Sequence, residues 1–297
     1  MSDSIVTRLN TAEDRPQLLA LWQHVFGDDP ALINCFLDAF GSPGNVMVTE
    51  CGNHIVSAIY MLPLEGIRYP DGTLHPISLT YALATEPAYR GRGIGRSTMN
   101  AAIRESFRRG FDHNALWPAE DSLFPHYTRT SGYLDCFTVR ELSRTAVELQ
   151  QLPAADAVIQ ADAAGYNTFR NAYLDRLGIL YIRFGERAVS YQMDTAGMYG
   201  GGCFLLGTDA PWGCFCCEYS DAETVTIREL LCPGHALDNA LAQIAAKFPA
   251  ASYTIRIPAA AGAGTDGLVR RCGQLQTASG SREFLACAGA YYGLAFD

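Results

Sequence analysis

Residues 89–97 read Tyr-Arg-Gly-Arg-Gly-Ile-Gly-Arg-Ser, and this stretch separates two segments with different hydrophobic periods. The preceding residues 77–84 are rich in apolar and β-branched side chains, which predicts a strand, whereas the apolar residues of 94–109 recur at helical spacing. Three glycines at every second position let the backbone turn tightly and approach a ligand. The unpaired N–H groups at the start of the following helix favour an anion. The stretch therefore predicts an α/β protein with a phosphate-binding strand–loop–helix unit.

Two common phosphate-binding motifs do not fit these letters. A dinucleotide-binding G-x-G-x-x-G motif requires glycine where the chain has Arg96 or Thr98. A Walker loop requires Gly-Lys followed by Ser or Thr, which the stretch lacks. Arg90, Arg92 and Arg96 instead place positive charge beside the glycines, although the whole protein has a formal charge of −9. The sequence thus predicts a local phosphate site on an acidic protein.

The composition is that of a globular protein, with 297 residues of which 48% are hydrophobic and 18% charged. At roughly 150 residues per domain, this length favours two domains. The net negative charge argues against a broad nucleic-acid-binding surface, and no apolar run of about 18 residues predicts a membrane span. The first residues lack the apolar core of a secretion signal, so a cytoplasmic protein is expected. Without export, the ten cysteines are expected to be reduced core thiols.

The remaining pattern predicts a mixed sheet flanked by helices in two parts, residues 1–150 and 151–297. In the first part, strands are expected at 5–9, 45–50, 54–62, 114–117 and 133–145, and helices at 18–26, 29–40 and 122–130. From about residue 152 the pattern restarts, with helices expected at 154–176, 187–193 and 233–248 and strands at 202–206, 213–219, 224–231 and 252–257. The last forty residues are rich in glycine and alanine and allow no assignment.

The hexad Arg90–Gly95 fits the pattern Arg-x-x-Gly-x-Gly, which resembles the pyrophosphate loop of GNAT N-acetyltransferases. Residues 79–90 are similar to the family's fourth strand running into this loop, residues 116–120 to its fifth strand, and residues 122–127 to the helix that carries a tyrosine. The whole chain looks like a short form of the two-part acetyltransferases of the enhanced intracellular survival type. Residues 1–150 would then be the GNAT domain, and residues 151–297 a degenerate GNAT-like half that shapes the acceptor site.

The resemblance implies acetyl-CoA as co-substrate and a small-molecule or peptide amine as acceptor. In the family the fourth and fifth strands splay apart, and the pantetheine arm pairs with the fourth like an added strand. Leu83 and Thr85 would face this arm, the loop would hold the pyrophosphate, and Arg90 either binds phosphate or caps the loop. The implied cofactor-binding residues are Leu83, Ala84, Thr85, Arg90, Gly91, Arg92, Gly93, Ile94, Gly95, Arg96 and Ser97.

Acetyl transfer to an amine needs a base for the ammonium and an acid for the departing thiolate. Tyr127 matches the family's tyrosine that donates to the CoA sulfur, and a free tyrosine is protonated at neutral pH. Four residues separate it from Gly132 where similar sequences usually have three, so His126 as the acid and a packing role for Tyr127 stay open. For the base, Glu86 and Glu120 lie near predicted strand ends, although each can also be a solvated loop residue.

In longer relatives the C-terminal carboxylate acts as a base in the active site. This chain ends Tyr-Tyr-Gly-Leu-Ala-Phe-Asp at residues 291–297, and the resemblance implies that such an apolar tail can dock and place Asp297 as a catalytic carboxylate. The alternative is a simple edge strand or docked tail.

Two other functions are compatible with the sequence. One is a non-catalytic acyl-CoA-binding or regulatory protein that keeps the phosphate loop. The other is a structural-zinc or redox protein, because Cys214-x-x-Cys217 and Cys232-x-x-His235 have a spacing that can hold zinc. Cys214 and Cys217 lie in a predicted strand, however, and a strand points them to opposite faces. We therefore expect core thiols and no bound metal.

Overall fold

The computed structural model describes residues 4–152, 157–261, 266–294 and 296. Contacts group the chain into two compact units. Unit 1 comprises Met1–Gly66, His75–Asp135 and Gln274–Arg282, and unit 2 comprises Ile67–Leu74, Cys136–Gly273 and Glu283–Asp297. A boundary at residue 150 between a GNAT domain and an acceptor-shaping domain stays a prediction.

Unit 1 is built on a mixed sheet with the strand order β1-β2-β3-β6-β7-β15. β6 and β7 run parallel, and the other neighbouring pairs in this order are antiparallel. The predicted elements of residues 5–131 are confirmed, with ends that differ by at most three residues. The elements are β1 (Ile5–Leu9), α1 (Arg15–Phe26), α2 (Pro30–Phe40), β2 (Val46–Cys51), β3 (His54–Pro63), β6 (Ile77–Thr85), α3 (Ile94–Arg108), β7 (His113–Leu116), α4 (Leu123–Ser131) and the end of β15 (Leu268–Thr277).

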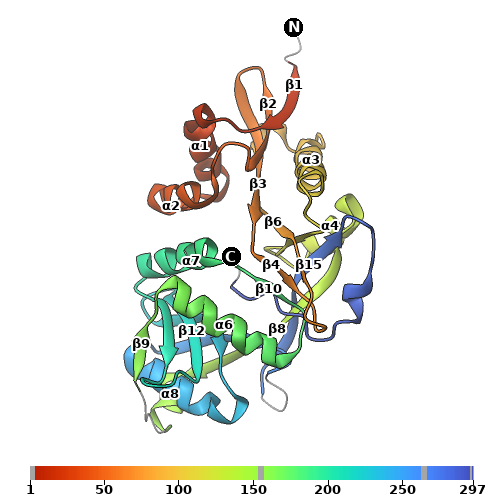
Figure 1. The fold of residues 1–297 in the computed structure, drawn as a ribbon. Helices are drawn as coiled ribbons and strands as arrows, with labels where there is room; N and C mark the ends of the chain where they lie inside the picture. Colours follow the sequence, from red (N-terminus) through yellow and green to blue (C-terminus); the bar gives the residue numbers. More distant parts are fainter. Residues whose placement is uncertain (1–3, 153–156, 262–265, 295, 297) are drawn as a thin grey trace. The chain divides into compact units, whose positions relative to one another are not determined.

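Helices cover both faces of this sheet: α3 packs on one face of β3, and α1 and α2 on the other (Figure 1). On the α3 side, Met99 and Ile103 belong to an apolar cluster with side chains of β2 and β3. On the other side, the rings of Trp22, Phe36 and Tyr60 have centroids 4.8–5.1 Å apart. Each such buried side chain contributes roughly 1.5–3 kcal/mol. Burial on both faces explains why β3 is almost continuously apolar.

The end of β15 closes the sheet of unit 1, and the sequence did not predict this strand. Gln274–Thr277 pair antiparallel with His113–Leu116. The strand carries many polar residues, so no hydrophobic period marks it. Gln274 is buried all the same, because its amide donates to the Phe124 carbonyl at 3.1 Å and to the Asp135 carboxylate at 2.8 Å.

Unit 2 has a similar plan, with the strand order β8-β14-β13-β12-β11-β9. β13 and β14 run parallel and are connected through α8, while the other neighbouring pairs are antiparallel. A small separate sheet has the order β10-β4-β5. The elements are β4 (Gly66–Arg68), β5 (Leu74–His75), β8 (Leu134–Thr145), α5 (Ala146–Gln150), β9 (Val158–Gln160), α6 (Ala163–Leu177), β10 (Tyr181–Arg183), α7 (Glu186–Met198), β11 (Gly202–Leu206), β12 (Gly213–Tyr219), β13 (Thr224–Leu231), α8 (Leu237–Lys247), β14 (Ser252–Pro258) and the start of β15.

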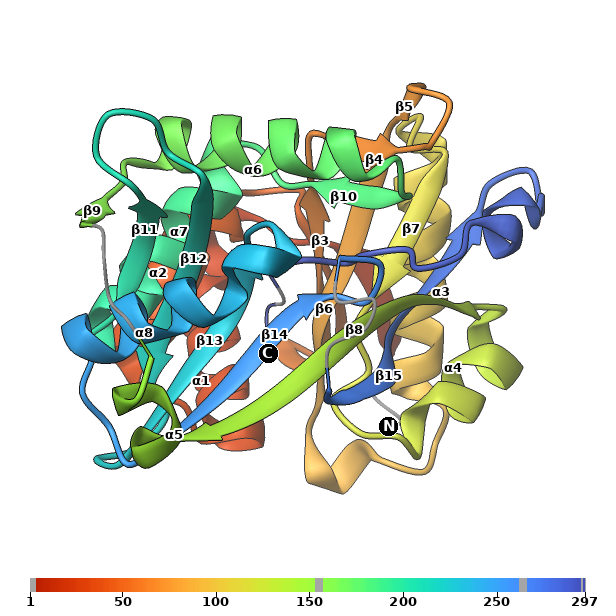
Figure 2. The same cartoon turned by 90° about the horizontal axis from the view of Figure 1, so that it is seen from below.

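The core of unit 2 also has two layers, with α8 on one face of the sheet and α6 and α7 on the other (Figure 2). Leu241 and Ile244 of α8 join an apolar cluster with Phe204, Phe215 and Ile255 of the strands. Within the described part of the chain, no helix is both long and apolar enough to cross a bilayer.

The helix predicted at 154–176 is wrong in its first part. Residues 153–156 lie outside the described residues, Val158–Gln160 form β9, and α6 begins only at Ala163. The reason is local. The Asp162 carboxylate accepts from the Gly165 N–H at 2.7 Å and so caps the helix there. Upstream of this cap, the β-branched Val158 and Ile159 pair with β11, and this pairing outweighs the helix propensity of the neighbouring alanines.

Candidate functional site

The two parallel strands of unit 1 separate after three residue pairs. β6 and β7 pair only from Ile77↔His113 to Leu79↔Ala115. On its other edge, β6 pairs Tyr81 with Tyr60 and Ala84 with Ala58, so Ala82 and Leu83 lie opposite Ile59 alone. This is a β-bulge, and Ala82 has the positive φ of 51° that bends the strand. Beyond Leu79, no described strand pairs with the β7-facing edge of β6, which leaves an open backbone edge.

Backbone groups of Leu83 and Thr85 point toward this open edge. The Glu86 N–H donates to the Val56 carbonyl at 2.9 Å, so Glu86 faces β3. Because neighbouring residues of a strand point their backbone groups to opposite sides, Thr85 faces away from β3. The Thr85 carbonyl accordingly accepts from Nε of Arg90 at 3.0 Å. An extended ligand can therefore pair with this edge, as the sequence resemblance predicts.

The glycine-rich loop ends directly at the N-terminus of α3. Gly91 and Gly93 have φ values of 76° and 77°, which glycine adopts without strain. Gly93 is the N-cap and has no side chain to satisfy the first amides, and the first turn contains no acidic residue. The Ser97 N–H closes the first helical turn on the Gly93 carbonyl at 3.0 Å. The preceding N–H groups have no partner within the helix and form a site for an anion.

Gly95 sets the distance between this helix and β6. A Cβ at Gly95 would lie 2.8 Å from Oγ1 of Thr85 and 3.9 Å from Cδ2 of Leu83. The Thr85 hydroxyl is itself held at 3.0 Å from Oγ of Ser57, so it is not a freely moving group. Only glycine allows α3 to approach so closely. The open strand edge and the anion site consequently lie next to each other.

Tyr127 points inward from α4. It packs on the apolar cluster of unit 1 that Leu83 also contacts, and its ring lies 6.5 Å from that of Tyr133. Burial raises the pKa of Tyr127, so its hydroxyl stays protonated at neutral pH. The neighbouring His126 is exposed. The additional residue before Gly132 therefore does not turn Tyr127 out to solvent.

A buried polar network lies where β6 and β7 separate, and no sequence pattern predicted it. The Tyr133 hydroxyl donates to Oδ1 of Asn114 and lies 2.9 Å from Oγ1 of Thr80. The Asn114 amide donates to Oγ of Ser78 at 3.2 Å, and Ser78 contacts Ser106 of α3 at 3.0 Å. These hydrogen bonds hold β6 and β7 together next to the point at which the two strands separate. The one available signal was Tyr133 directly after the glycine that ends α4.

The candidate bases differ in their surroundings. The Glu86 carboxylate is 20% exposed and lies 3.6 Å from Nε2 of His24 and 4.0 Å from Nε2 of His54, two histidines to which the sequence assigned no role. Glu120 is exposed and accepts from Oγ of Ser122 at 3.2 Å. Asp297 lies outside the described residues.

The cysteines of the zinc alternative line the core of unit 2. Cys214 and Cys217 lie within β12 rather than in a turn, and both are fully buried. Burial raises the pKa of Cys232 to about 12, so its side chain is a neutral buried thiol at neutral pH. Among the residues that the structure describes, no group of three or more histidine, cysteine or acidic side chains is placed to hold a metal ion.

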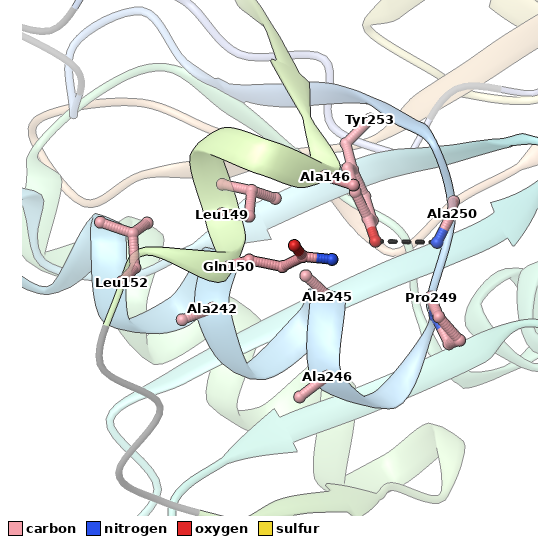
Figure 3. A pocket seen from close by; sticks show the side chains of 10 residues that line it. All are labelled: Ala146, Leu149, Gln150, Leu152, Ala242, Ala245, Ala246, Pro249, Ala250 and Tyr253. Atoms are coloured by element: carbon pink, nitrogen blue, oxygen red, sulfur yellow. Dashed lines mark hydrogen bonds between the residues drawn. The ribbon is translucent and has the colours of Figure 1, made fainter.

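A cavity of about 370 Å³ lies between α5 and α8 in unit 2 (Figure 3). Alanine and leucine side chains make up most of its lining, and Gln150 and Tyr253 supply its polar side chains. The Tyr253 hydroxyl is already engaged, since it accepts from the Ala250 N–H and donates to the Phe248 carbonyl, each at 3.0 Å. This cavity offers no acid, base or anion site.

Comparison with known proteins agrees with the geometry of unit 1. Residues 6–134 match the family model of an acetyltransferase (GNAT) domain. No sequence among curated proteins matches the chain. A solved GCN5-related N-acetyltransferase from Kribbella flavida is 19% identical with a TM-score of 0.73, and the match covers 93% of this chain and 71% of that one. Eis1 from Mycobacterium abscessus is 11% identical with a TM-score of 0.60, and 92% of this chain and 73% of that one are covered.

A putative acetyltransferase from Pyrococcus horikoshii is 10% identical with a TM-score of 0.62, and the match covers 98% of this chain and 95% of that one. At such identities the solved structures show a shared fold and no more. The family model adds what the fold alone does not, since it covers the bulged strand, the glycine loop and α4. Residues 6–134 are therefore a GNAT acetyltransferase domain, a domain family whose members use acyl-CoA as co-substrate.

Proposed function

We propose that this protein transfers the acetyl group of acetyl-CoA to the amine of a small molecule or peptide. One observation carries the proposal: the open edge of β6 lies directly beside the uncapped N-terminus of α3. A pantetheine arm has amide groups that can pair with the first, and a pyrophosphate has the charge that suits the second. We further propose that residues 151–297 shape the acceptor site and that the protein is cytoplasmic.

The cofactor residues divide into two groups. Leu83 and Thr85 offer backbone groups to the pantetheine, with Ala84 between them hydrogen-bonded to β3. The pyrophosphate is held by the N–H groups of Gly91 to Ser97, assisted by the charges of Arg92 and Arg96. Arg90 has a structural part in this arrangement, because its guanidinium caps the Thr85 carbonyl at 3.0 Å. Its charge remains close to the loop and adds to the attraction.

Acetyl transfer proceeds in this proposal by direct attack of the neutral amine on the thioester. The carboxylate of Asp297 takes the proton that the ammonium must lose, and the Tyr127 hydroxyl donates a proton to the sulfur as the C–S bond breaks. A buried hydroxyl suits this step, because Tyr127 stays protonated until the thiolate develops. No covalent intermediate with the protein is needed.

The first test is calorimetric titration of the whole protein with acetyl-CoA. We expect saturable binding at about one site per chain, weakened at least tenfold in Gly93→Asp, whose carboxylate would repel the phosphates. A panel of amines is then assayed by mass spectrometry of the acetylated product, because ten cysteines interfere with thiol-release reagents. Absence of binding refutes the proposal. Binding without turnover on any amine would instead support a non-catalytic acyl-CoA-binding protein.

A further inference from the structure

Unit 2 contains an ion pair that is completely shielded from solvent. Arg170 of α6 and Glu229 of β13 both have side chains with 0% exposure, and Nε of Arg170 lies 2.9 Å from Oε2 of Glu229. The Tyr166 hydroxyl donates to the same oxygen at 3.0 Å. The Nη1 group of Arg170 donates to the Ile182 carbonyl of β10 at 3.0 Å. None of these residues belongs to the proposed acetyl-CoA site.

Such a pair is a poor source of stability. Desolvation of two charges offsets most of their attraction, so well-packed apolar residues of similar volume are often as stable. One polar atom here, Nη2 of Arg170, is also buried without a hydrogen-bond partner in the described part of the chain. An unsatisfied buried group costs about 1–3 kcal/mol. The pair therefore calls for an explanation in terms of the geometry that it imposes.

The segment held at this pair is the C-terminal one. Tyr291 forms a parallel bridge with Tyr181, its N–H donates to the Leu180 carbonyl at 2.8 Å, and its carbonyl accepts from the Ile182 N–H at 3.3 Å. The segment is thus paired with β10, the strand whose Ile182 carbonyl binds Arg170. Arg170 consequently contacts the strand with which the C-terminal segment pairs.

Gly293 shows how closely the chain approaches the charges. Its φ is 89°, and a Cβ built there would lie 2.0 Å from Nη2 of Arg170 and 3.1 Å from Oε1 of Glu229. The Arg170 side chain has no room to retreat, because Glu229 and Ile182 hold it. After this turn, Leu294 is fully buried and the Phe296 ring stacks on Tyr191 at 5.5 Å. The pair thus borders the turn at Gly293 that precedes Leu294 and Phe296.

We infer that Arg170 and Glu229 are positioning residues for the C-terminal segment, which they lock against β10 through Gly293. The inference rests on the proposed function, in which Asp297 follows this segment as the base. If Asp297 is the base, a shift of the backbone turn at Gly293 lowers the rate of the step that needs this carboxylate. The pair then affects the chemical step without touching either substrate.

The test replaces both charges at once, because removal of one would leave the other buried and uncompensated. In the variant R170M/E229M, we expect hydrogen exchange of the peptide covering residues 288–294 to be at least tenfold faster, with α8 and β12 unchanged within twofold. We also expect kcat to fall at least fivefold while KM for acetyl-CoA stays within twofold. A merely structural role would not produce this division between kcat and KM.

A second variant tests the same contact without removing a charge. Gly293→Ala should also speed exchange at residues 288–294, because its Cβ cannot coexist with Arg170. Gly178→Ala is the matched control, since Gly178 also has a positive φ in unit 2 and a Cβ there would meet nothing within 4 Å.

The inference is overturned if folded R170M/E229M exchanges at residues 288–294 like the wild type, or if Gly293→Ala behaves like Gly178→Ala. If hydrogen exchange of residues 288–294 becomes faster in R170M/E229M but kcat does not fall, the claim that the pair affects the chemical step is overturned. If the wild type acetylates no amine at all, the proposed function fails instead, and exchange still decides whether the pair holds the segment.

Discussion

The contact between Gly95 and Thr85 provides the sharpest test of the acetyl-CoA site. In Gly95→Ala the new methyl group would lie 2.8 Å from Oγ1 of Thr85, closer than side chains approach in folded proteins. Thr85 is tied to Ser57 and its backbone continues the open edge of β6. Either α3 moves outward or this edge is displaced. Both changes alter the spacing between the pantetheine edge and the anion site.

The magnitude follows from the overlap. Inserting a methyl group into a packed contact of this kind costs about 1–3 kcal/mol. If the ligand restores the original spacing when it binds, most of this cost appears as lost affinity. We therefore expect the Kd for acetyl-CoA to rise roughly 5- to 150-fold, at 1.4 kcal/mol per tenfold change.

Calorimetry on a double-mutant cycle measures this effect. Thr85→Ala removes the hydroxyl that the new Cβ would meet at 2.8 Å, so the pair Gly95→Ala/Thr85→Ala should bind within about threefold of Thr85→Ala alone. Gly110→Ala, at the other end of α3, has a positive φ but a Cβ there meets nothing within 4 Å, and it should leave the Kd unchanged. Wild-type affinity in Gly95→Ala, or a loss that Thr85→Ala does not rescue, would refute the spacing argument.

Three further predictions concern unit 1. Tyr127→Phe should lower kcat about 10²–10⁴-fold without changing the Kd for acetyl-CoA, and an unchanged kcat in stopped assays would exclude it as the acid. Burial lowers the pKa of His113 to about 4, against about 6.5 when unfolded, so the unfolded state binds more protons between these values. The free energy of unfolding should thus fall as pH drops from about 6.5 to about 4, and urea titrations of His113→Gln should lack that part of the slope. Tyr133→Phe should cost about 1–3 kcal/mol in the same titrations, since Thr80 and Asn114 lose a buried partner, and a neutral result would contradict the network.

Most of unit 1 could be predicted because its signals are local. Hydrophobic spacing and residue composition predict the glycine-rich loop, the helix of residues 94–108 and the strands before it. The bulge at Ala82 could not be predicted, because alanine carries no preference for a positive φ and the strain is imposed by β3. The same holds for β15, whose buried Gln274 depends on partners about 140 to 150 residues away.

Among the site residues, too, local sequence predicts some positions and tertiary contacts determine the others. Sequence periodicity places Tyr127 on a helix, but only packing against the cluster shared with Leu83 shows that it points inward. His24 and His54 carry no local signal, since each becomes a neighbour of Glu86 only through the pairing of β3 with β6 and the packing of α1. Residues brought together by tertiary contacts were therefore missed, while residues whose chemistry lies within one loop were found.

The two units share a strand arrangement but differ at the bulged strand that lies beside the parallel neighbour. In unit 2, β13 pairs Ile227 with Cys217 and Glu229 with Cys216, so Arg228 is an extra residue, and this bulge corresponds to the one at Ala82 in β6. Pairing with the parallel neighbour ends at Ile227, just as it ends at Leu79 in unit 1.

The residues at the two bulges explain the difference. In unit 1 the bulge carries Ala82 and Leu83, both half-buried, and leads into a loop whose glycines expose amides. In unit 2 it carries Arg228 and Glu229, which α6 and α7 engage through Arg170 and Gln192, and Pro233 replaces the glycine-rich turn. A proline and a covered bulge leave no amide-lined edge for a cofactor. The same bend in the strand instead points a carboxylate into the core, where it binds Arg170 and meets the C-terminal chain at Gly293.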